Sequence, residues 1–187
     1  MSLFDKIANF YDRIVGPFNL EEILDYFSLE PNGLLIDLGG GTGRVAKQLV
    51  QHVSECLILD SSYDMLRQAT DLSERIILLD SLAEQIPIQT GSIKQIFLND
   101  SLHHIQKQKE TLAECYRILA SGGELIIREF DRIYFWNVFL IIMEFFLCFK
   151  STFLTPKELS SMCQQLGFST SIIRPTKATY IMIAKKE

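Results

Sequence analysis

The 187-residue sequence has few cysteines and places them in no pattern typical of a metal site. Cys56, Cys115, Cys148 and Cys163 form no C-x-x-C pair, and none lies near a histidine pair with zinc spacing. The spacing favours neither a structural zinc nor a disulfide framework. We therefore expect no metal, and buried, reduced thiols in a cytosolic protein.

The sequence also lacks an excess of positive charge. Lysine and arginine together number 18 against 23 aspartates and glutamates, which gives a formal net charge of −5. Proteins that bind nucleic-acid phosphates usually show the opposite balance, so we expect no nucleic-acid partner. A small neutral or cationic ligand suits this charge better.

Targeting signals, internal repeats and linkers are missing as well. The first residues, Met1 to Lys6, contain no basic region followed by an apolar core, which predicts a cytoplasmic location. The length suits one domain. We predict a single domain over 1–187, with an N-terminal helical segment at 1–30 and an apolar helical insertion at 131–153.

What the sequence does contain is an alternation of short apolar runs and segments with helical periodicity. The runs are 34–38, 57–60, 76–80, 93–99 and 124–129, and the helical segments are 42–52, 62–70 and 107–119. This alternation predicts an α/β fold: a doubly wound, Rossmann-like, mostly parallel sheet with helices on both faces. A helix capped by Thr155, followed by runs at 169–174 and 178–184, predicts a C-terminal antiparallel hairpin.

Polar residues stand at the ends of four consecutive runs. Asp37, Asp60 and Asp80 end the first three, and Asn99 ends the fourth. In a doubly wound sheet the ligand lies outside the carboxyl ends of the strands. We therefore predict that these side chains share one rim of the sheet.

A glycine-rich loop, Asp37-Leu38-Gly39-Gly40-Gly41-Thr42-Gly43, follows the first run, and two interpretations of it stay open. The frame Gly41-x-Gly43-x-x-Ala46, with Asp60 further on, fits the loose dinucleotide pattern and an NAD(P)-dependent oxidoreductase. In the other frame Asp37 precedes the glycines. Its charge would repel a pyrophosphate and suits an ammonium or sulfonium ligand.

Together with their neighbours, these motifs resemble class I S-adenosylmethionine-dependent methyltransferases of the small-molecule, quinone-methylating type. The resemblance covers about residues 36–129 and depends on the order and spacing of segments 36–43, 58–66, 80–87, 99–105 and 112–123. It implies an enzyme that binds S-adenosylmethionine, transfers its methyl group and releases S-adenosylhomocysteine. Gln95 and Ser121 depart from the family pattern, at positions that do not usually contact the cofactor.

The resemblance implies a set of cofactor contacts. They are Tyr11, Asp37, Gly39, Gly40, Gly41, Asp60, Ser61, Met65, Asp80, Ser81 and Leu82 (with their backbone near the adenine), and Asn99. Asp37 would support the cofactor ammonium, directly or through water, together with the backbone carbonyl of Asn99. Asp60 would accept hydrogen bonds from both ribose hydroxyls, and Asp80 from the adenine amine.

The remaining contacts concern the backbone and the apolar surfaces of the cofactor. Gly39 and Gly41 would let the backbone approach the methionine portion and the ribose. Met65 would pack on the adenine, although a methionine on a helix face also suits the core. Tyr11 resembles part of the family's lid segment, so 1–30 would form a helical lid; a core aromatic is the alternative.

His103 and His104 are the only local candidates for a general base. The family often carries a similar histidine pair without using it as a base, so helix capping or packing is the alternative. The sequence alone does not assign a catalytic residue.

The acceptor is indicated by residues 133–149, which are almost continuously apolar and are interrupted by Asn137 and Glu144. This segment suits a helix that roofs the active site, a helix that docks on a membrane or forms a homodimer, or a membrane span. The first two favour a small hydrophobic acceptor such as a quinol or lipid precursor. A non-catalytic, membrane-associated adaptor of the same fold also stays open.

Overall fold

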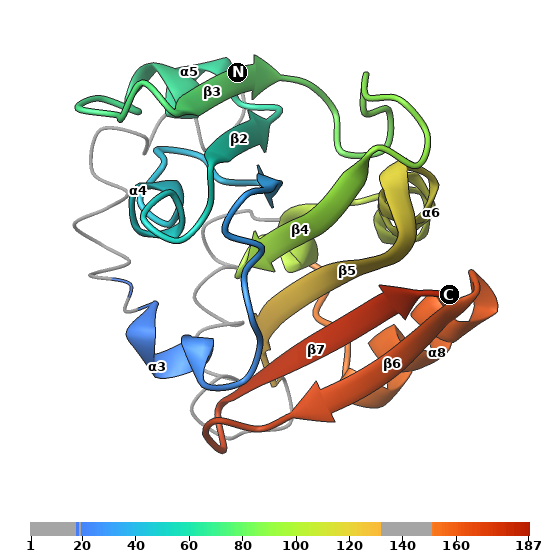
Figure 1. Ribbon diagram of the computed structural model, residues 1–187. Coiled ribbons are helices and arrows are strands. Elements are labelled where there is room, and N and C mark those ends of the chain that lie inside the picture. The colour runs from blue at the N-terminus through green and yellow to red at the C-terminus, as the bar shows by residue number, and fades with distance from the viewer. Residues whose placement is uncertain (1–17, 19, 132–150) are drawn as a thin grey trace.

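A computed structural model describes residue 18 and residues 20–131 and 151–187. Within these ranges a seven-stranded sheet has the order β3-β2-β1-β4-β5-β7-β6 (Figure 1). The strands are β1 (Leu34–Leu38), β2 (Glu55–Asp60), β3 (Ile76–Asp80), β4 (Ile93–Asn99), β5 (Leu119–Phe130), β6 (Phe168–Ile173) and β7 (Thr179–Lys186). Strands β1 to β5 are parallel, whereas β7 pairs antiparallel with β5 and β6. The predicted sheet and its C-terminal hairpin are confirmed.

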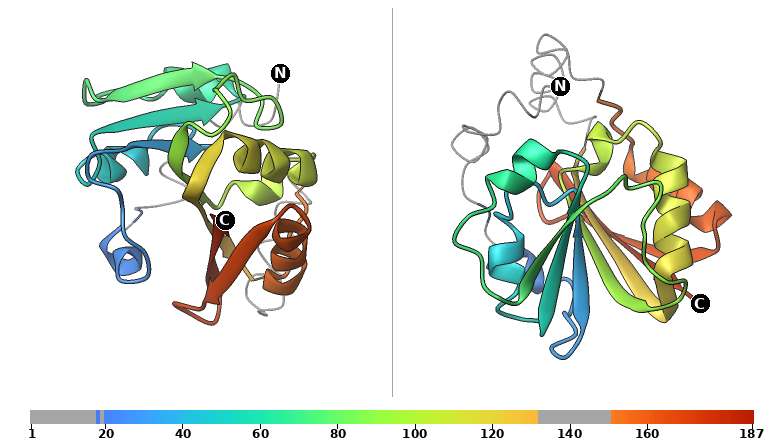
Figure 2. Two further views of the ribbon diagram at one scale, coloured as in Figure 1. Left: turned by 45° about the vertical axis from the view of Figure 1, so that its right-hand side comes forward. Right: turned by 90° about the horizontal axis from the view of Figure 1, so that it is seen from above.

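Helices cover both faces of this sheet (Figure 2). Those described are α3 (Glu21–Leu24), α4 (Ala46–Leu49) and α5 (Tyr63–Arg67) on one face, α6 (Gln108–Ile118) and α8 (Pro156–Gln165) on the other, and the short 3-10 helix η2 (Leu102–His104). Strand β1 shows why two layers form: Leu35 packs into the core beneath α4, while Ile36 and Leu38 pack into the core beneath α6. A strand that is apolar on both faces needs a helical layer on each side.

Two predicted helices are shorter than the periodicity suggested. The segment 42–52 forms a helix only over α4, because Gly43 has a φ of 77° and keeps the preceding residues in a loop. The segment 62–70 forms a helix only over α5, with the Ser62 side chain accepting a hydrogen bond from the Met65 N–H at 3.3 Å. The predicted start of α8 is confirmed, because the Thr155 side chain and its partner three residues on form a capping box.

Several predictions fall on residues outside the described ranges. Tyr11 and most of the predicted lid at 1–30 are among them, as is the apolar run 133–149 within the predicted insertion at 131–153. Its three interpretations therefore stay predictions. Among the residues that the structure describes, no helix combines the length and apolar character needed to cross a membrane.

Candidate functional site

A cavity of about 380 Å³ lies where β1, β2 and β4 end. It is lined by segments that follow four strands of the sheet, as the crevice rule for doubly wound folds requires. The predicted residues that line it are Asp37, Gly39, Gly40, Gly41, Asp60, Ser61, Met65, Ser81, Leu82, Asn99 and His104. The topology thus brings together most of the candidate set around one space of a size that suits a small organic ligand.

The glycine loop adopts a backbone that requires glycine. Gly39 and Gly41 have φ values of 74° and 52°, a region that other residues rarely occupy. A Cβ atom on Gly39 would lie 2.7 Å from the Cβ of Ser101, and one on Gly41 would lie 3.0 Å from the Cε of Met65. The loop therefore borders the cavity with its backbone and carries no side chain from Gly39 to Gly41.

Asp60 is oriented by backbone donors from two loops. The Gly41 N–H donates to its Oδ2 at 2.9 Å and the Ser62 N–H to its Oδ1 at 2.8 Å. Burial raises the pKa of this carboxyl, although its backbone hydrogen bonds oppose that shift. Each oxygen keeps a second lone pair, so Asp60 remains able to accept from a pair of ligand hydroxyls.

Asp37 is a buried acid whose carboxyl group the described residues satisfy only in part. Its residue is 1% exposed, and its Oδ2 has no hydrogen-bond partner among the described residues. Burial, followed by the charge of Asp60, raises the pKa of Asp37 to about 7. A buried carboxylate oxygen without a donor is costly, and a ligand ammonium would relieve that cost. The site therefore fits a cofactor that combines a ribose with a cationic amino group.

Asp80 lies at the same edge of the sheet but does not line the cavity. It is opposite Asp60 in the β2–β3 register, and its residue is exposed. The following residues, Ser81 and Leu82, do line the cavity. The structure thus places the backbone after β3 at the site more directly than the Asp80 carboxylate.

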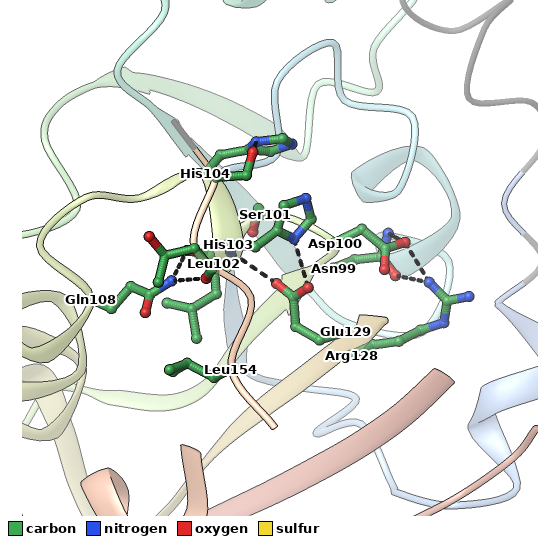
Figure 3. Close-up of polar contacts among 12 residues, drawn as sticks. Asn99, Asp100, Ser101, Leu102, His103, His104, Gln108, Arg128, Glu129 and Leu154 are labelled. Carbon is green, nitrogen blue, oxygen red and sulfur yellow. Dashed lines mark hydrogen bonds and ion pairs between the residues drawn. The ribbon is translucent and has the colours of Figure 1, made fainter. Parts of the chain in front are cut away.

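The two histidine candidates differ sharply (Figure 3). His103 is 4% exposed, does not line the cavity, and holds its Nδ1 2.6 Å from the Oε2 of Glu129. Its backbone N–H donates to the Oε1 of Glu129 at 3.2 Å, and its ring stacks on Phe153 at 4.3 Å between centroids. This geometry places the His103 ring in a buried contact with Glu129 and Phe153, outside the residues that line the cavity.

His104 does line the cavity, but its chemistry is that of a neutral ring. Burial, and second the adjacent His103, lower the pKa of His104 to about 2. The two rings lie 4.0 Å apart between centroids, and the Nδ1 of His104 lies 3.1 Å from the Oγ of Ser151. His104 is therefore a weak base at neutral pH and serves better as a hydrogen-bonding group.

A further polar residue near η2 was not among the predicted site residues. Asp100 follows β4, lines the cavity and forms an ion pair with Arg128 of β5 (Figure 3). The side chain of Asn99 donates to the Oδ2 of Asp100 at 3.1 Å and accepts from Arg128 at 3.2 Å. The only signal in the sequence is a polar residue at the end of each strand, because the pairing depends on Asn99 lying opposite Arg128 in the sheet.

Comparisons with known proteins indicate which family the domain resembles. Residues 36–127 match the family model described as "Methyltransferase domain". An uncharacterized protein of Methanocaldococcus jannaschii is 28% identical over 199 aligned positions, covering 99% of this chain and 89% of that protein. The ubiquinone/menaquinone biosynthesis C-methyltransferase UbiE of Rhizobium johnstonii is 26% identical over 113 residues, which cover 56% of this chain and 44% of UbiE. The chain thus spans less than half the length of that relative.

Solved structures share the fold of the described residues. A SAM-dependent methyltransferase of Thermotoga maritima superposes with a TM-score of 0.77 at 22% identity, covering 99% of this chain and 98% of that one. The comparisons lend no support to the oxidoreductase or adaptor alternatives. The matched domain, its UbiE relatives and the shared fold lead to one conclusion: residues 36–127 of this chain form a methyltransferase domain similar to those of the class I S-adenosylmethionine-dependent, UbiE-like enzymes.

Proposed function

We propose that the protein transfers the methyl group of S-adenosylmethionine to a small, hydrophobic acceptor that carries a hydroxylated ring, as a quinol does. The observation that carries this proposal is the cavity at the strand ends, where the unpaired Oδ2 of Asp37 lies beside the glycine loop. The name of the UbiE relative supports a quinol acceptor. The apolar character of residues 133–149 supports the same class.

When bound, S-adenosylmethionine supplies a methyl group on a positively charged sulfur. The chain's own residues bind and orient the cofactor: Asp37 holds the ammonium and Asp60 holds the ribose hydroxyls. The exposed backbone of Gly39 and Gly41 admits the cofactor closely, and Met65 packs on its adenine. Such positioning accounts for much of the rate enhancement when two reactants must meet in line.

The residues that line the cavity support an acceptor that reacts without a strong general base from the protein. Within the part of the chain that the structure describes, His104 is the histidine that lines the cavity, and its low pKa makes it a weak base. His103 has its Nδ1 on Glu129. An electron-rich ring carbon beside a hydroxyl needs less help from a base than a protonated amine does.

The test is formation of S-adenosylhomocysteine from S-adenosylmethionine with 1,4-dihydroxynaphthalene, kept reduced, compared with phosphoethanolamine. We expect turnover with the aromatic diol and none with the polar amine, and calorimetric binding of S-adenosylmethionine but not of NADH. Asp37→Asn should lose turnover, whereas Glu110→Gln on the exposed surface of α6 should keep it. Turnover with phosphoethanolamine alone would contradict the proposed acceptor class.

A further inference from the structure

Asp100 lines the cavity and carries a buried oxygen that no part of the cofactor site uses. Its side chain is 14% exposed, and its Oδ1 is buried without a hydrogen-bond partner among the described residues. The other unpaired carboxylate oxygen at this cavity belongs to Asp37. One cofactor ammonium satisfies Asp37 and leaves the Oδ1 of Asp100 for a different group.

Among the described residues, hydrogen-bond donors reach only one of the two carboxylate oxygens of Asp100. Its Oδ2 accepts from the guanidinium of Arg128 and from the side chain of Asn99, so both donors meet the same oxygen (Figure 3). Its backbone has a φ of 50°, and its N–H donates to the carbonyl of Arg128 at 2.9 Å. Burial raises the pKa of Asp100, and the charge of Arg128 opposes that shift. The result is a fixed acceptor whose second oxygen is free.

The position of Asp100 relates it to the cofactor end that reacts. Asn99, its neighbour, is the residue whose carbonyl we assign to the cofactor ammonium, and Ser101 ties the same turn to the glycine loop through a 3.0 Å bond to the Leu38 carbonyl. His104, a neutral ring, lies one turn further along and also lines the cavity. Asp100 therefore adjoins the methionyl end of the cofactor site, where an acceptor must approach.

From these contacts we infer that Asp100 is a specificity-determining residue: its free Oδ1 accepts a hydrogen bond from a hydroxyl or amino group on the methyl acceptor. This inference rests on the proposed function and deepens it, because it requires a donor group on an otherwise apolar acceptor. A buried carboxylate oxygen that is left without a hydrogen-bond donor costs more free energy than the loss of one ordinary contact. A molecule of the same shape without the donor should accordingly be rejected.

The experiment measures binding to the full-length protein saturated with S-adenosylhomocysteine, using two matched probe pairs. The hydroxyl pair is 1,4-dihydroxynaphthalene and 1,4-dimethoxynaphthalene. The amino pair is 1-naphthylamine and N,N-dimethyl-1-naphthylamine. We expect the probe with the donor to bind about tenfold or more tightly than its methylated partner in at least one pair, the factor typical of a hydrogen bond to a charged group.

Asp100→Asn is the informative variant, because its amide oxygen can replace Oδ2 toward Arg128 while its amide nitrogen replaces the free Oδ1. The preference for the donor should then disappear while affinity for S-adenosylhomocysteine stays unchanged, and a cooperative melting transition, lowered by loss of the ion pair with Arg128, should show that the variant is folded. The control is Glu110→Gln, which removes an exposed carboxylate from α6 and should keep the preference. A preference that survives Asp100→Asn would overturn the inference, and so would an equal loss of cofactor affinity, since Asp100 would then serve the cofactor.

The two pairs separate this inference from the proposed function. Asp100-dependent selection of the amine alone would support the inference and refute a quinol acceptor. Turnover of the diol without any dependence on Asp100 would support the proposed function and refute the inference. Tighter binding of the methylated probe would show a protonated Asp100 that donates, and would also refute it, as would equal binding within both pairs.

Discussion

The pKa of Asp37 makes cofactor binding depend on pH. In the ligand-free protein this pKa is raised to about 7, from a usual value of 3.8, by burial and by the charge of Asp60. To hold an ammonium group, the Asp37 carboxyl must be ionised. Below about pH 7, binding of S-adenosylhomocysteine must therefore release a proton, and its affinity should decline as the pH is lowered.

The magnitude follows from proton linkage. If the ammonium keeps Asp37 ionised in the complex, affinity falls by about tenfold for each pH unit below the free pKa. Affinity at pH 6 should accordingly be about tenfold lower than at pH 7.5. Near pH 7, about half a proton should be released per ligand bound. Asp37→Asn should bind more weakly at pH 7.5 and lose this pH dependence.

The assay is calorimetric titration in two buffers that differ in their enthalpy of ionisation, from pH 6 to pH 7.5. The matched ligand is 5′-methylthioadenosine, which keeps the ribose and adenine but has no amino group. Its affinity isolates any contribution from Asp60, whose pKa is also raised. The reasoning is refuted if S-adenosylhomocysteine binds equally well at both pH values, or if the two ligands show the same pH dependence.

The same shift predicts how the ligand-free fold responds to pH. Because the folded pKa of about 7 lies above the unfolded value of 3.8, the protonated Asp37 stabilises the fold at low pH. That contribution is lost as the pH rises through 7, and at 1.36 kcal/mol per unit it amounts to at most about 4 kcal/mol. The melting temperature should fall between pH 5 and pH 8, and less so in Asp37→Asn.

Three further substitutions test the site and its support. Asp60→Ala removes the acceptor of the Gly41 N–H and of the ribose, so calorimetry should show cofactor affinity lowered by roughly 1.5–3 kcal/mol; unchanged affinity would remove this assignment. Gly41→Ala places a Cβ 3.0 Å from the Cε of Met65 at a φ of 52°, so urea unfolding should show a loss of about 1 kcal/mol or more. Glu129→Gln breaks the buried pair with His103 and should lower stability by about 3 kcal/mol. Replacing both residues by apolar ones should restore much of it, and an unchanged single variant would show that this contact does not stabilise the fold.

Local patterns predicted those parts of the fold that local chemistry controls. Runs such as 34–38 are apolar on both faces, so a buried parallel strand followed, and Thr155 with Pro156 marked the start of α8. The limits of elements were less accurate. Periodicity over 42–52 does not reveal that Gly43 ends the loop with a positive φ, at a place where a Cβ atom would lie 2.9 Å from Ile58 and 3.2 Å from Leu72 of other segments.

The sequence by itself determined the alternation of strands and helices, the glycine loop and the acids at the strand ends, because each is specified by residues close together in the chain. That was enough to identify the fold and the cofactor class. Only the tertiary structure decided which of these groups are satisfied. Sheet register brings Arg128 to Asp100 and Glu129 to His103, and it leaves one carboxylate oxygen of Asp100 without a hydrogen-bond partner among the described residues. These pairs join residues more than 20 positions apart in the sequence, so only the folded structure brings them into contact.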